Sequence, residues 1–216
     1  RAPRTAPVQL RARASALRDS PLLATLTTRM QTRLNVRLER GSVAPPGMPV
    51  LATGAGSADA AQWLLEHGAQ QLLCLAATAP LPGRVVIFAP DEKARRGTFA
   101  VAASLLRHLP AEATYLSICP AKMHETDRAA SMRQLLDARS GALAEHGLDM
   151  RTEVRDGDVG TELLREMLGQ EPTMLVLGIG NLAGVKPAWF VQLLEGPFQR
   201  SILVVRPPDA ESSADT

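Results

Sequence analysis

The chain has 216 residues, of which 45% are hydrophobic and only 3% aromatic, and its formal net charge is +2. This length suits one large domain or two small ones around an aliphatic core, and no apolar run reaches the about 18 residues of a transmembrane helix. The two cysteines, Cys74 and Cys119, each lie in an apolar run without disulfide or metal-ligand spacing, which indicates reduced core thiols in a cytoplasmic protein.

The charge is distributed unevenly. Residues 1–40 hold nine arginines against Asp19 and Glu39, which gives this part +7 and leaves −5 for the rest. We interpret the run as a solvated helix face behind a flexible basic lead-in, residues 1–20. The alternative is a segment beside the cytoplasmic face of a membrane domain upstream of Arg1, since basic residues gather there. We expect no nucleic-acid partner, because no aromatic side chains are interleaved to stack on bases.

Because the chain begins with arginine rather than methionine, we expect it to be part of a longer polypeptide. In its first part, hydrophobic spacing predicts helices and proline or glycine clusters predict loops. The expected order is helix, strand, strand, helix, strand: residues 21–34, 35–39, 50–53, 58–67 and 71–76. Residues 77–83 are expected to form a linker.

The second part has a regular alternation. Four apolar runs predict strands at residues 84–89, 113–119, 174–177 and 202–205, and an alternating pattern predicts a strand at 150–155. Between them, helical spacing predicts helices at residues 93–109, 127–146, 159–168 and 187–194. Strands that alternate with helices predict an α/β fold with a doubly wound parallel sheet and right-handed crossovers. Residues 209–216 are expected to form a disordered tail.

Two parts of the sequence resemble each other. LLEHGAQQLLCL (64–75) aligns without gaps with LLEGPFQRSILV (193–204), and VRLERG (36–41) resembles TEVRDG (152–157). Repeats of this size predict two copies of one supersecondary plan. The sequence therefore predicts a partial unit at residues 21–80 and a complete unit at 84–208.

The second unit resembles the universal stress protein (UspA-like) family. The resemblance lies in RVVIFAPDEK (84–93), in EHGLDMRTEVRDGDVGTELL (145–164), and in VLGIGNLAG (176–184) followed by ILVVRPP (202–208). It implies a three-layer, five-stranded fold of the adenine nucleotide α-hydrolase-like type. It also implies pairing through the last strand, Ile202–Val205, either with a second copy or within the chain as a pseudo-dimer.

The resemblance places a nucleotide site at the glycine turn after residue 177. Its candidate residues are Asp91, Gly178, Gly180, Asn181, Gly184 and Lys186. ATP-binding members carry Gly-x-x-Gly, nine residues, and then Gly-Ser or Gly-Thr. Here Asn181 stands in place of the second glycine, and Val191 and Gln192 stand about where the glycine–hydroxyl pair belongs.

We interpret the turn as a strand-to-helix connection in which glycine supplies unusual dihedral angles. Backbone N–H groups that cradle a phosphate, with ATP or AMP as ligand, are the alternative. Asp158 is expected to cap a helix. Since no His/Cys pair has metal-ligand spacing and no nucleophile–base pattern is present, we expect no metal, no cofactor and no catalytic residue.

The function that we expect is that of a non-catalytic regulatory or sensor module, not of an enzyme. We place it in the cytoplasm, as the cytoplasmic domain of a membrane ion or amino-acid transporter. The alternative is a free-standing tandem universal stress protein that binds ATP or AMP in the stress response.

Overall fold

A computed structural model describes the larger part of the chain. The described residues are 9–12, 21, 22, 25, 37–39, 50–54, 71–75, 81–169, 171, 173–180, 188–196 and 200–206. The strands are β1 (Gln9–Ala12), β2 (Arg37–Glu39), β3 (Val50–Gly54), β4 (Gln71–Leu75), β5 (Arg84–Phe88), β6 (Glu112–Cys119), β7 (Arg151–Asp156), β8 (Thr173–Gly178) and β9 (Ile202–Val205). The labelled helices are α3 (Glu92–Leu106), α4 (Glu125–His146), α5 (Val159–Leu168) and α6 (Ala188–Glu195).

All the described strands belong to one sheet. Its order is β2-β1-β3-β4-β9-β8-β5-β6-β7. Neighbouring strands are parallel except at one place, where β4 runs antiparallel to β9 with Leu73 opposite Leu203. The predicted α/β class is therefore confirmed, as are the five strands and four helices of the second part.

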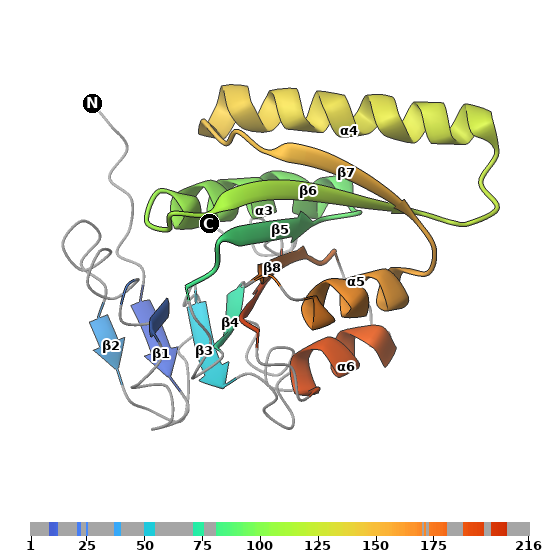
Figure 1. The fold of residues 1–216 in the computed structure, drawn as a ribbon. Helices are drawn as coiled ribbons and strands as arrows, with labels where there is room; N and C mark the ends of the chain where they lie inside the picture. Colours follow the sequence, from blue (N-terminus) through green and yellow to red (C-terminus); the bar gives the residue numbers. More distant parts are fainter. Residues whose placement is uncertain are drawn as a thin grey trace, which may run out of the picture.

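Two hydrophobic clusters, one on each face of the sheet, explain why strands β5 and β8 are continuous aliphatic runs. Val85 and Ile87 of β5 join one cluster together with α3 and α4. Val86 and Phe88 join the other cluster together with α5 and α6. Successive side chains of a strand point to opposite faces, so a strand covered on both faces must be apolar at every position. Figure 1 shows the resulting three layers.

Local signals determine where the helices begin and end. Asp91 caps α3 and Asp158 caps α5, each by accepting a hydrogen bond from a backbone N–H of the first turn, so the predicted Asp158 cap is confirmed. Helix α4 ends at Gly147, whose φ of 65° is the left-handed conformation that favours glycine. Helix α3 ends three residues before the predicted residue 109, because Pro110 disfavours the helical conformation before it.

Helices α5 and α6 pack closely. Phe190 is fully buried, and Trp189 lies edge-on to it with ring centroids 5.9 Å apart. The Trp189 side chain also lies directly against the backbone of Gly160, at the start of α5, where a larger residue would collide with it. Phe190 therefore belongs to the core between these helices and the sheet.

The first part of the chain differs from expectation at one point. Strand β1 lies within residues 1–20, which were expected to form a flexible lead-in, and it pairs in parallel with both β2 and β3. Its four residues, QLRA, carry little hydrophobic signal, so the strand depends on these two partners. Of the helix expected at 21–34, only residues 21, 22 and 25 are described, all three helical, and Leu22 is 2% exposed in the core. The helix expected at 58–67 and the tail at 209–216 lie outside the described residues.

The β4–β9 pair divides the sheet into a first half, β1–β4, and a second half, β5–β9. Read outward from this pair, the first half runs β4-β3-β1-β2 and the second half runs β9-β8-β5-β6-β7. In each half, the strand that comes last in the sequence (β4 or β9) lies innermost, and the strand before it (β3 or β8) is next. The first strand of the half (β1 or β5) and its second strand (β2 or β6) follow outward. The second half has one further strand, β7, at its outer edge.

Candidate functional site

The loops that follow β5 and β8 meet at one edge of the sheet. These strands are parallel neighbours, with Phe88 opposite Leu177 near their carboxyl ends. The chain leaves β5 towards β6 by way of α3, and it leaves β8 towards β9 by way of α6 on the other face. Ligands of open α/β sheets bind at such a reversal of strand order, which we call the switch point.

Asp91 and Gly180 are in direct contact at the switch point. One carboxylate oxygen of Asp91, Oδ1, accepts a hydrogen bond from the backbone N–H of Lys93 at 2.8 Å. The other oxygen, Oδ2, lies where a side chain of residue 180 would begin, and a Cβ at that place would also lie 3.0 Å from Cγ of Asp91. Glycine at position 180 is therefore what lets the carboxylate lie on the turn.

Gly178 has a similar role one step earlier. A Cβ at residue 178 would collide with the hydroxyl of Thr98 and would lie 2.7 Å from Cβ of Ala89. Thr98 is fully buried and donates its hydroxyl to the carbonyl oxygen of Ala94 at 2.8 Å, so it has little freedom to move. The glycine at 178 allows α3 to pack directly on the end of β8.

Neither glycine supplies an unusual dihedral angle. Among the described glycines only Gly147 and Gly157 have a positive φ. The expectation that Gly178 and Gly180 provide special backbone conformations is therefore wrong, since both serve close approach instead.

Three of the six predicted site residues come together: Asp91, Gly178 and Gly180. The other three, Asn181, Gly184 and Lys186, lie outside the described residues. The part of the turn that is described presents a carboxylate, and a carboxylate repels an incoming phosphate.

Arg95 and Tyr115, which the sequence analysis did not single out, lie next to this site. Tyr115 donates its hydroxyl to the carbonyl oxygen of Ala89, at the end of β5, at 3.2 Å. Burial raises the pKa of Tyr115, and the nearby charge and hydrogen bond of Arg95 oppose the rise. The Nε atom of Arg95 is buried and has no hydrogen-bond partner within the described part of the chain. The sequence feature that could have identified Arg95 is its spacing, because residue 95 lies one helical turn after Asp91.

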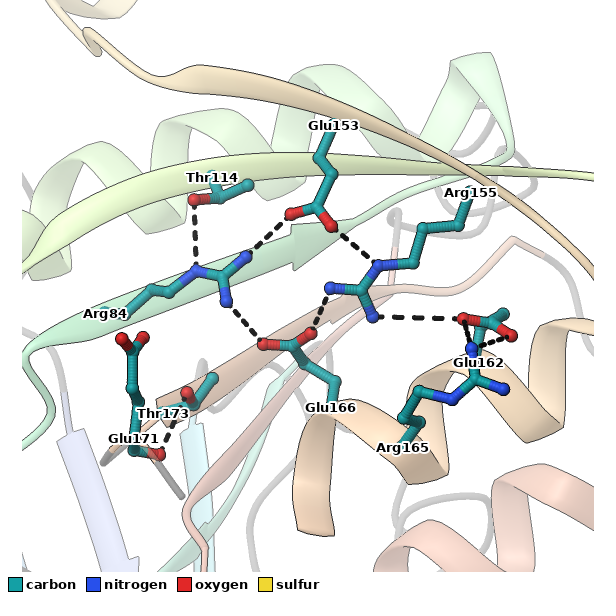
Figure 2. A network of polar contacts seen from close by, with 9 residues as sticks. All are labelled: Arg84, Thr114, Glu153, Arg155, Glu162, Arg165, Glu166, Glu171 and Thr173. Carbon is teal, nitrogen blue, oxygen red and sulfur yellow. Dashed lines mark hydrogen bonds and ion pairs between the residues drawn. The ribbon is translucent and has the colours of Figure 1, made fainter. Parts of the chain in front are cut away.

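A second cluster of charged side chains lies on the α5 side of the sheet (Figure 2). Arg84 binds Glu153 at 2.8 Å and Glu166 at 2.9 Å. Arg155 binds the same two carboxylates, at 2.7 Å and 2.6 Å. These four residues, which we call the charged ring, thus form a closed circle that joins β5, β7 and α5.

The charged ring is partly buried, with Glu153 its most exposed member at 36%, and it is electrically balanced. The side chain of Glu166 is only 6% exposed, and those of Arg84 and Arg155 are 25% and 20% exposed. Burial by itself would lower the pKa of Arg155, but the hydrogen bonds and charges of Glu153 and Glu166 outweigh it and raise the pKa. An adjoining Glu162, 4% exposed, is bound by Arg165 at 2.6 Å.

A cavity of about 590 Å³ opens beside the charged ring, at the amino ends of β5, β6 and β7. Its lining residues are Gly83, Arg84, Glu112, Thr114, Arg151, Thr152, Glu153 and Glu171. Both of its arginines are already paired, Arg84 within the ring and Arg151 with Glu112 at 3.2 Å. Because both arginines are paired, the cavity offers no unpaired cation to an anionic ligand. It lies at the amino ends of the strands, whereas the switch point lies at their carboxyl ends.

Two further features concern possible metal ligands and thiols within the described ranges. There, no group of three or more His, Cys, Asp or Glu side chains could hold a metal ion. Burial raises the pKa of Cys74 to about 12, so its thiol stays protonated at neutral pH. None of the helices within the described ranges combines the length and the apolar character that crossing a membrane requires.

Comparison with solved structures identifies the fold. The chain superposes on a putative universal stress protein from Pseudomonas aeruginosa UCBPP-PA14 with a TM-score of 0.56 and 13% identity, over 93% of this chain and 82% of that one. A functionally unknown protein from Pseudomonas aeruginosa PAO1 gives a TM-score of 0.54 at 13% identity, with the same two coverages. A universal stress protein from Archaeoglobus fulgidus DSM 4304 gives 0.50 at 13% identity, over 88% and 76% of the two chains.

No protein-family model matches the sequence, and none of the curated proteins matches it. At 13% identity the structural likeness establishes the fold alone. The chain thus has the α/β fold of the universal stress proteins, as the resemblance implied.

Proposed function

We propose that the chain is a non-catalytic regulatory or sensor module with a degenerate nucleotide site. The observation that carries the proposal is the departure from the ATP-binding pattern, since Asn181 replaces the second glycine and Val191 and Gln192 replace the glycine–hydroxyl pair. The described part of the turn lies at the switch point, and the described groups that line it include the negative charge of Asp91.

Electrostatics supports this proposal. Two like charges 4 Å apart repel by about 1 kcal/mol in water and by about 4 kcal/mol at an effective dielectric constant of 20. A phosphate at the turn would meet this repulsion from Asp91. It would also lack the glycine–hydroxyl pair that ATP-binding universal stress proteins carry, since Val191 and Gln192 stand there.

Calorimetric titration with ATP, AMP and cyclic dinucleotides tests the proposal. We expect no micromolar binding by the wild-type chain. Asp91→Asn is the informative variant, because asparagine still caps a helix but carries no charge. If the turn retains a phosphate-binding geometry, this variant gains affinity for ATP relative to the wild type. Micromolar binding of ATP or AMP by the wild-type chain would instead favour a free-standing tandem universal stress protein.

We also propose that the two halves of the sheet form an intrachain pseudo-dimer of one complete and one shortened unit. Supporting observations are the antiparallel β4–β9 pair and the matching strand order on its two sides. Strand β1 then belongs to the shortened unit, which begins at or before residue 9 instead of at residue 21. In this arrangement β9 has β4 of its own chain as its outer neighbour, so the last strand is not free to pair with a second copy.

The setting that we propose is the cytoplasmic side of a membrane ion or amino-acid transporter. The support is the arginine excess of residues 1–40, since basic residues near the cytoplasmic leaflet are attracted by its anionic lipids. The sequence encoded upstream of Arg1 is the test. A series of apolar spans of about 20 residues agrees with this setting, whereas a further strand–helix–strand unit contradicts it.

A further inference from the structure

Helix α4 carries a stripe of exposed apolar side chains. Among the described residues, the exposed large hydrophobic side chains are Met132, Leu136, Leu143 and Leu168, at 41%, 47%, 50% and 71% exposure. The first three lie on α4, four and seven residues apart. At 3.6 residues per turn they lie within roughly 40° of one another around the helix. We call these three residues the α4 stripe.

The stripe lies beside the buried side of α4 and faces away from α3. Leu135 and Ala142, the residues of α4 that are buried, point into the core. On one side of them Glu145 pairs with Arg96 of α3 at 3.6 Å. On the other side Arg128 pairs with Asp156, the last residue of β7, at 2.8 Å.

Continuing around the helix in that direction, Arg139 follows, paired with Asp149 at 3.4 Å, and the stripe comes after it. It therefore lies beyond β7, which is the edge strand of the sheet. Figure 1 shows α4 along β7 at this outer margin. No described element of the chain covers the stripe.

The α4 stripe and the charges next to it are self-complementary. Arg133 and Asp137 are exposed, lie one helical turn apart and flank the stripe on its solvent side. When two α4 helices pack antiparallel with Leu136 facing Leu136, Arg133 of one copy faces residue 139 of the other. Asp137 of the other copy is then about two residues away, or roughly 3 Å along the helix axis. In the same register Leu143 faces Ala129 and Met132 faces Ser140, so that large side chains oppose small ones.

We propose that the α4 stripe is the contact surface for a second copy of this chain, in an antiparallel two-fold dimer. A two-fold axis requires the same patch on both copies, and the stripe with its flanking Arg133 and Asp137 meets that requirement. This surface goes beyond the regulatory function proposed above, and it lies at the opposite margin of the second half from β9. One helix face is small compared with the about 1,600 Å² of a standard interface, so we expect the dimer to dissociate on dilution.

Sedimentation velocity of the 216-residue chain over a series of concentrations tests the proposal. The wild type should shift from monomer to dimer as the concentration rises. Leu136→Asp should raise the dissociation constant at least about tenfold, because it buries an unpaired charge at the centre of the contact. Leu168→Asp, an exposed leucine on α5 outside the stripe, is the matched control and should leave association unchanged. A wild type that is monomeric at every concentration, or a dimer that Leu136→Asp leaves intact, would overturn the proposal.

Charge reversal tests the antiparallel register separately. Arg133→Asp or Asp137→Arg alone places like charges opposite each other and should raise the dissociation constant several-fold. The double variant restores opposite charges across the axis and should return the dissociation constant to near the wild-type value. Urea unfolding of each variant checks that folding is retained, which the exposure of both side chains leads us to expect. A double variant that associates as weakly as the single variants would contradict the antiparallel register.

Discussion

At the scale of single residues, the switch point depends on two glycines that leave room for side chains of α3 and of the preceding loop. Gly178 accommodates Thr98, and Gly180 accommodates the carboxylate of Asp91. Both contacts join segments about 80 to 90 residues apart in sequence. The glycine pattern predicted a tight turn here, but the side chains that require the glycines, Thr98 and Asp91, become evident only in the folded chain.

Gly178→Ala should destabilise the fold by about 1–3 kcal/mol, the usual cost of overpacking a closely packed site. Gly97→Ala is the matched control, because a methyl group there meets nothing within 4 Å and the residue lies inside α3. The control should be neutral or stabilising by roughly 0.5–1 kcal/mol. Urea denaturation of both variants makes the comparison, and equal effects would contradict the close packing of Thr98 on Gly178.

The cysteine thiols provide a second measurement at this scale. Cys74 is fully buried with a pKa raised to about 12, and Cys119 is 2% exposed. We expect both thiols to resist iodoacetamide at pH 8 in the folded chain and to react quickly in urea. Mass spectrometry after timed labelling would report the result, and rapid labelling of Cys74 under native conditions would contradict its burial in the sheet.

At the scale of elements, the charged ring connects α5 to β5 and β7. No sequence pattern indicated the ring, because its members lie 2 to 82 residues apart and each alone resembles an ordinary surface charge. Hydrophobic periodicity, in contrast, predicted every strand of the second half to within one or two residues. Strand β1 was missed because its short polar sequence depends on neighbours far along the chain.

Glu166→Gln should destabilise the chain by about 2 kcal/mol. Removing one partner from a buried ion pair costs about 3–5 kcal/mol, and the partial exposure of both arginines reduces this cost. Glu112→Gln is the control, since the side chains of Glu112 and its partner Arg151 are 68% and 77% exposed. The control should change the free energy of unfolding by less than about 1 kcal/mol. Similar losses in both variants would show that the ring contributes no more than a surface pair.

The cap of α5 should make stability depend on pH. Hydrogen bonds from the backbone N–H and the hydroxyl of Thr161, at 2.9 Å and 3.1 Å, lower the pKa of Asp158. Its contribution is therefore fully present above the unfolded pKa of about 3.9 and is lost as the pH falls through the lower folded value. The stability gap between the wild type and Asp158→Ala should thus narrow in acid.

Urea unfolding at a series of pH values measures this gap. Asp158→Asn is the control, because asparagine caps without titrating, so its stability relative to Asp158→Ala should not change with pH. A gap between the wild type and Asp158→Ala that stays constant into strong acid contradicts the cap.

At the scale of the whole molecule, the sheet combines a universal stress protein fold with a further set of parallel strands across the β4–β9 pair. The sequence repeat predicted two related units. The strand order agrees with that prediction except at β2, which takes the position of β6 and not that of β7, the strand with which its sequence aligns. The short β2–β3 connection explains the difference in size: ten residues separate these strands, where the second half places α4, β7 and α5 between β6 and β8.

The most direct test of the degenerate nucleotide site is a titration with ATP, and then with AMP, monitored by heteronuclear NMR. The signals to follow are the amide resonances of Gly178 and Gly180. Both amides belong to the turn on which Asp91 lies, so a bound phosphate would shift them. We predict that neither resonance moves with saturation at micromolar nucleotide in the wild-type chain. Saturable shifts of both resonances at micromolar ATP or AMP would contradict the proposal and would show a functional nucleotide site at the switch point.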